Sequence, residues 1–83
     1  MLMTAVRPDG TVLLTCESCG HLLVIDPKTG RISRRLPDVE QLTTAGLLTL
    51  DPVGNIYVAV FEPVSVVVLD PDGNYLDGLF HHD

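Results

Sequence analysis

Short runs of apolar residues, each ended by a turn signal, make up most of this chain. The turns are built on Pro and Gly, because Pro presets the first turn dihedral and Gly accepts a positive φ. The longest break lies at residues 37–44, where the Thr pair and the short length allow one helical turn at 38–43 and no more. The pattern predicts eight β-strands and no convincing helix, with strands at residues 2–6, 12–16, 21–25, 31–36, 45–50, 56–60, 64–69 and 75–80.

This run-and-turn pattern repeats at an offset of 44 residues. Both turns and both strands stay in register, which chance would not preserve. After a one-residue gap, Gly30 aligns with Gly73 and Leu36 with Leu79. The pairs before that gap are Pro8 and Pro52, Gly10 and Gly54, Val12 and Ile56, Leu14 and Val58, Leu22 and Val66, Val24 and Val68, Ile25 and Leu69, Asp26 and Asp70, and Pro27 and Pro71.

Four strands in a repeat of about 40–45 residues are typical of a β-propeller blade. The inner strands are apolar at consecutive positions, as expected of a sheet covered on both faces, and the last strand of each unit is more polar. A two-sheet sandwich also has short strands at this spacing, but its halves need not repeat. We therefore predict an all-β fold of two four-stranded antiparallel blades, at residues 1–36 and 45–80, with an inter-blade connection at 37–44 and a tail at 81–83.

Two motifs carry a resemblance to known propellers. They are Pro-x-Gly-Asn-Ile-Tyr-Val-Ala at residues 52–59 and Val-Val-Val-Leu-Asp-Pro-Asp-Gly-Asn at residues 66–74. Together they resemble an NHL repeat, and they are similar to blades of the senescence-marker-protein, gluconolactonase and streptogramin-lyase propellers. The resemblance covers nearly the whole chain as two blades. It implies a fold more than an activity, because these families use the same blades in enzymes, receptors and scaffolds.

Composition narrows the classes of partner. Hydrophobic residues make up 46% of the 83 residues and charged residues 19%, which is more apolar surface than one small core hides. The net charge of −6 disfavours nucleic acid, and the longest apolar run, residues 66–69, is far too short for a membrane span. The first six residues lack a basic start and a long apolar region, so we expect a soluble cytoplasmic protein. Its expected partners are further copies of itself or adjoining propeller blades.

The strand order separates the loops into two rims. Consecutive loops of a meander alternate between its ends, so the turns at 7–10, 26–30, 51–54 and 70–73 share one rim. The loops at 17–20 and 61–65 and the connection at 37–44 share the other, which in propellers is commonly the binding face. We predict that this candidate binding rim carries Glu17, Cys19, His21, Asp38, Glu40 and Glu62.

The run Cys-Glu-Ser-Cys-Gly-His at residues 16–21 is the strongest hint of a metal. Haem attachment would need a His directly after the second Cys. A structural zinc site needs four ligands, and this run supplies three, with a fourth to come from Glu17, Glu62 or a second chain. We expect Cys16 to be a small buried apolar residue and the terminal His pair to be frayed. No catalytic residue, cofactor or metal ligand is therefore predicted, although a divalent ion stays open.

Two functions remain. The first is a non-catalytic repeat module that serves as a binding or assembly scaffold, because two blades cannot close a ring and leave apolar faces at both ends. The alternative is a relative or fragment of a metal-dependent lactonase or hydrolase of the gluconolactonase type, with its metal beside Glu17 and Glu62. In those enzymes an Asn ligand precedes the Gly that opens an innermost strand, and here residues 43–46 are Thr-Thr-Ala-Gly.

Overall fold

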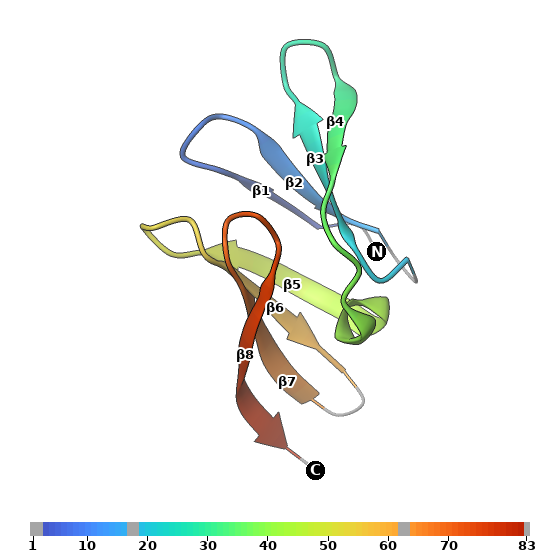
Figure 1. Ribbon diagram of the computed structural model, residues 1–83, viewed down its shortest axis with the longest axis vertical. Helices are drawn as coiled ribbons and strands as arrows, with labels where there is room; N and C mark the ends of the chain where they lie inside the picture. The colour runs from blue at the N-terminus through green and yellow to red at the C-terminus, as the bar shows by residue number, and fades with distance from the viewer. Residues whose placement is uncertain (1–2, 17–18, 62–63, 83) are drawn as a thin grey trace.

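The chain forms two four-stranded antiparallel sheets, each in the order of the sequence (Figure 1). A computed structural model describes residues 3–16, 19–61 and 64–82. It confirms the prediction of an all-β chain with two such sheets. Sheet 1 contains β1 (Thr4–Val6), β2 (Val12–Thr15), β3 (Leu22–Asp26) and β4 (Arg31–Arg35), and sheet 2 contains β5 (Ala45–Leu50), β6 (Ile56–Val60), β7 (Val64–Leu69) and β8 (Tyr75–His82).

The two turns on the upper rim of sheet 2 are closed by the same hydrogen bonds. The backbone N–H of Gly54 donates to the carbonyl of Asp51 at 3.0 Å, and that of Gly73 donates to the carbonyl of Asp70 at 2.9 Å. In both turns the Asp side chain accepts hydrogen bonds from the backbone N–H groups two and four residues later. The Asp carboxylate thus closes each turn upon itself, which is why Asp is favoured there.

Sheet 1 has one buried and one half-buried face. Strand pairing places Leu13 opposite Val24 and Thr15 opposite Leu22, and these four side chains are at most 3% exposed. The intervening residues point to the other face, because side chains alternate along a strand. That second face, called the free face of sheet 1, consists of Val12, Leu14, Leu23 and Ile25, all half-buried.

Sheet 2 has the same two-sided organisation. Ile56 pairs with Leu69 and Val58 pairs with Val67, and none of the four is more than 2% exposed. The alternate positions form the free face of sheet 2. Its members are Tyr57, Ala59 and Val66, which are half-buried, and Val68, which is buried but lies outside the main core cluster.

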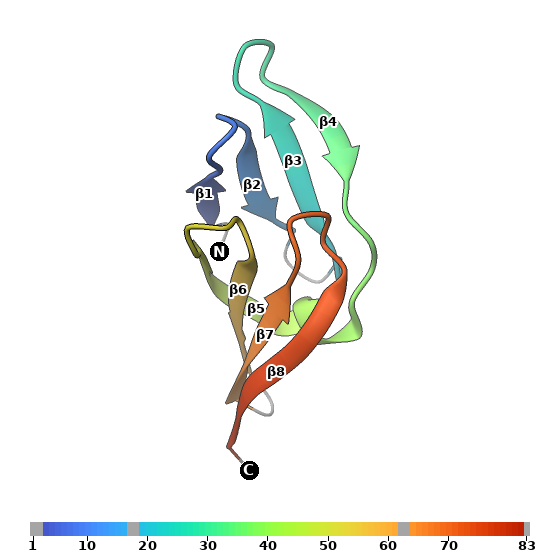
Figure 2. The ribbon, with the colours of Figure 1, turned by 60° about the vertical axis from the view of Figure 1, so that its left-hand side comes forward.

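The two buried faces form one core with the inter-sheet connection. Leu36, Val39 and Leu42 from residues 36–42 join residues of both sheets in a single cluster of buried side chains. The connection contains a short 3-10 helix, η1 (Glu40–Thr44), which lies below sheet 1 in Figure 2. The backbone N–H of Leu36 donates to the carbonyl of Leu22 at 2.9 Å, so the connection begins as an extension of β4 along β3.

Polar contacts also join the sheets at their hairpin turns. Arg7, in the β1–β2 turn, donates from Nη1 to the carbonyl of Pro71 at 2.7 Å. Arg34 of β4 lies 3.3 Å from Asp72 in the β7–β8 turn. The β7–β8 turn of sheet 2 is therefore held between two elements of sheet 1.

One element extends beyond its expected end. β8 runs to His82, because His81 and His82 pair with Ser65 and Val64 at the start of β7. The backbone of residues 81 and 82 is thus part of a strand rather than frayed. The other strands begin and end within two residues of the predicted limits.

Replacing Gly73 by Ala tests the packing between the sheets. A Cβ at Gly73 would lie 2.8 Å from the Cβ of Leu36, whereas a Cβ at Gly10 would meet nothing within 4 Å. Both glycines have a positive φ, of 86° and 89°, so each change should cost about 1–2 kcal/mol of backbone strain. Gly73→Ala should cost about 1–3 kcal/mol more, because it forces the sheets apart. Denaturant unfolding measures both, and equal losses would contradict the packing.

Candidate functional site

Three segments meet at the rim opposite the hairpin turns. The N–H of Val39 donates to the carbonyl of Gly20 at 2.7 Å, which joins the connection to the loop before β3. The hydroxyl of Thr44, at the end of η1, donates to the carbonyl of Phe61 at 2.7 Å. In Figure 1 the β1–β2, β3–β4 and β5–β6 turns lie at the upper and left side, and η1 lies at the lower right. Among the described residues, Cys16, Cys19, His21 and Asp38 lie close together at this second rim.

Cys16 and Cys19 form a disulfide at this rim. Their Cα atoms are 5.3 Å apart, which is within the usual range for such a bond. Cys16 is half-buried at the end of β2, and Cys19 is exposed. The expectation that Cys16 is simply a small buried apolar residue is wrong, because its sulfur is bonded to that of Cys19. The N–H of Cys19 also donates to the carbonyl of Cys16 at 3.1 Å.

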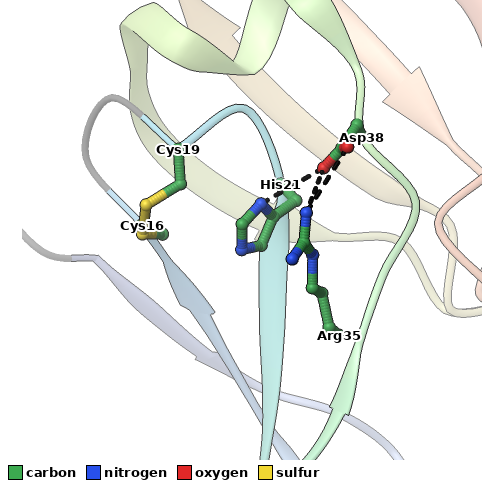
Figure 3. Close-up of a disulfide and its surroundings, with 5 residues drawn as sticks. All are labelled: Cys16, Cys19, His21, Arg35 and Asp38. Carbon is green, nitrogen blue, oxygen red and sulfur yellow. Dashed lines mark hydrogen bonds and ion pairs between the residues drawn. A yellow bond between two sulfur atoms is a disulfide. The ribbon is translucent and has the colours of Figure 1, made fainter.

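His21 lies between the disulfide and an acidic group (Figure 3). Its side chain is only 12% exposed, and its Nδ1 is 3.3 Å from a carboxylate oxygen of Asp38. That nitrogen is buried and is not aligned to make a hydrogen bond. Nδ1 of His21 therefore has an anionic neighbour but no hydrogen bond to it. A proton on Nδ1, or a ligand on the other ring nitrogen that places the proton on Nδ1, would allow that hydrogen bond to form.

Arg35 holds the carboxylate of Asp38 in place. One guanidinium nitrogen lies 3.1 and 3.4 Å from the two carboxylate oxygens, and both side chains are more than half exposed. The hydrogen bond from Arg35, with its positive charge and that of His21 when protonated, keeps the pKa of Asp38 below its ordinary value. Asp38 is thus a carboxylate at neutral pH, fixed between a cation and an imidazole.

The sulfur atoms and the imidazole lie close enough to share a ligand. One ligand atom from each of Cys16, Cys19 and His21 lies within 4.8 Å of the others. Thiolate and imidazole are the groups that Zn²⁺ and similar ions prefer. In the disulfide form the two sulfurs are neutral, and the metal ligand is the thiolate. This cluster therefore becomes a metal-binding set only when the bond is reduced.

The other predicted rim residues have different places. Glu40 is exposed at the start of η1, and among the described contacts its backbone carbonyl accepts a hydrogen bond from Thr43. Glu17 and Glu62 lie outside the described residues. The rim prediction did not include Arg35, whose signal in the sequence is its spacing of three residues before Asp38, nor Cys16, which had been assigned to the strand.

The sequence matches no protein-family model, and no curated protein is significantly similar to it. Among the described residues, the structure contains no helix of the length and apolarity needed to cross a membrane.

Arg35→Gln should raise the pKa of Asp38 toward the ordinary value for an Asp, because it removes the hydrogen bond and charge that lower it. A lowered pKa in the folded chain means that Asp38 stabilises the fold above the ordinary pKa and that this contribution is lost as the pH falls through the lowered value. The free energy of unfolding of Arg35→Gln should therefore change less than that of the parent as the pH falls through the acid range.

NMR titration of the Asp38 carboxyl carbon measures this pKa directly. Arg34→Gln is the matched control, since Arg34 pairs with Asp72 instead. An unchanged Asp38 pKa in Arg35→Gln, or an equal rise in Arg34→Gln, would contradict the pairing.

Proposed function

We propose that this chain is a pair of β-propeller blades of the NHL-repeat kind, and that it acts as a non-catalytic assembly scaffold that associates with further copies of itself. The observation that carries the proposal is that the two sheets pack through opposite faces, although their sequences repeat. The partner is therefore another pair of the same sheets.

The repeat identifies which faces are used. In the 44-residue alignment, the buried face of sheet 1 corresponds to the free face of sheet 2; Leu22 and Val24, for example, align with Val66 and Val68. Conversely, the buried residues Ile56 and Val58 of sheet 2 align with Val12 and Leu14, on the free face of sheet 1. Equivalent faces of the two sheets never meet each other.

Such a head-to-tail interface can be continued. The free face of sheet 2 corresponds in sequence to the buried face of sheet 1. The free face of sheet 1 corresponds in the same way to the buried face of sheet 2. A second copy can therefore dock its sheet 1 onto sheet 2 in the same geometry. A head-to-tail interface produces a ring if its rotation closes and a filament if it does not. Propellers close with four to eight blades, so two to four chains would complete a ring.

Apolar side chains on the free face of sheet 1 support this partner. Val6 pairs with Val12 and is 70% exposed, and Ile32 pairs with Ile25 and is 58% exposed. Together with the half-buried residues of the same face, they form an apolar surface that a neighbouring sheet would cover.

Val6→Arg combined with Ile32→Arg should weaken self-association by tenfold or more. Covering an aliphatic side chain contributes about 1.5–3 kcal/mol, and both substitutions place a charge in the contact instead. Val53→Arg is the control, because Val53 is 78% exposed in the β5–β6 turn, away from the free faces. Sedimentation over a concentration series measures the dissociation constants. A folded wild-type chain that stays monomeric throughout would overturn the proposal.

A further inference from the structure

We propose that reduction of the Cys16–Cys19 disulfide creates a binding site for Zn²⁺, with the two thiolates and His21 as ligands. The inference concerns the η1 rim and is independent of the assembly of the sheets. It depends on three ligand atoms that already lie within 4.8 Å of one another. They lie in the segment between β2 and β3, with Cys16 directly after β2 and His21 directly before β3.

The donor set selects the metal. Two thiolates and one imidazole are borderline-soft ligands, which bind Zn²⁺ in preference to Mg²⁺ or Ca²⁺. Cys-x-x-Cys is the spacing at which two sulfurs bind one ion from a single turn. Three protein ligands leave the fourth tetrahedral position to water or to an external ligand, as in sites where Zn²⁺ is reactive or exchangeable.

The surroundings of His21 match those of a metal-binding imidazole. Such a histidine binds the ion through one ring nitrogen and donates the other N–H to a carboxylate. Here Nδ1 is 3.3 Å from Asp38, which leaves Nε2 as the ligand nitrogen. Arg35 fixes the carboxylate in turn (Figure 3). Nδ1 has no hydrogen-bond partner in the disulfide form, and a modest rotation of the ring in the metal-bound form would complete the bond to Asp38.

The disulfide makes the site responsive to redox conditions. A dithiol supplies two electrons and two protons to the sulfur–sulfur bond and becomes a disulfide itself. A phosphine supplies the two electrons and becomes a phosphine oxide, while water supplies its oxygen and the two protons. Either reductant leaves two thiols on the chain. Binding of Zn²⁺ displaces the two thiol protons. A low-molecular-weight disulfide reverses the sequence: it takes the two electrons, the Cys16–Cys19 bond reforms and the ion is released. The exposure of Cys19 gives such a reagent access.

Titration with Co²⁺, a spectroscopic substitute for Zn²⁺, tests the site. After phosphine reduction under anaerobic conditions, the full chain should bind one Co²⁺ with thiolate-to-metal charge-transfer bands and the intense visible bands of tetrahedral geometry. Zn²⁺ should displace it, and the untreated disulfide form should show no such bands. A reduced chain without thiolate bands would overturn the proposal.

Variants separate the ligands from other metal-binding groups. Cys16→Ser and Cys19→Ser should each abolish the bands or weaken binding by more than a hundredfold. Asp38→Asn should weaken Zn²⁺ binding by about 10- to 100-fold, as for other residues that orient a ligand, and His21→Gln should weaken it more. Asp72→Asn is the control for Asp38→Asn, since both carboxylates are exposed and pair with an Arg.

A His81→Ala/His82→Ala variant should bind the metal as tightly as the parent. Full affinity in His21→Gln, or loss of the bands in the His81/His82 variant, would overturn the assignment of ligands. Circular dichroism of each reduced variant establishes that the sheets are intact, so that a loss of binding reports the ligand and not the fold.

Discussion

The packing of sheet 1 against sheet 2 through non-equivalent faces is the constraint on which the rest of the structure depends. Leu13 and Val24 from one sheet and Ile56 and Leu69 from the other are all but fully buried because the two faces meet. Neither sheet has another layer within the described chain to cover these residues. A core built in this way has two consequences: it holds the connection in a defined path, and it leaves each sheet with a second apolar face.

The path of the connection is what assembles the η1 rim. The core contains three apolar residues of the connection, Leu36, Val39 and Leu42. The polar residues between them are therefore exposed at fixed positions along the rim. Asp38 is one of these, and it arrives beside His21 because Val39 hydrogen-bonds to Gly20. The same hydrophobic contacts that stabilise the two sheets therefore place a carboxylate next to a buried imidazole. Assembly and metal binding would occupy different parts of the molecule, the first on the sheet faces and the second at the rim.

Much of the fold could be predicted because its signals are local. Apolar runs between Pro-Gly turns specify strands, and the Asp and Gly residues of each turn close it through bonds to their own neighbours. The candidate site was harder to predict from the sequence. Cys19, His21 and Asp38 were placed on one rim from the strand order alone, but the role of Arg35 depends on where the chain leaves β4. The disulfide depends on how close the chain brings Cys19 to Cys16. No periodicity reports either of these.

The strands, their order and the repeat follow from the sequence alone, because they depend on apolar runs and turn residues over a few positions. Which of the two apolar faces of each sheet is buried depends on how the two sheets pack against each other. Val12 and Leu13 are equally hydrophobic, and nothing local distinguishes them. The choice comes from the way the connection carries sheet 2 back onto one side of sheet 1. That same step decided which polar side chains of the rim would meet.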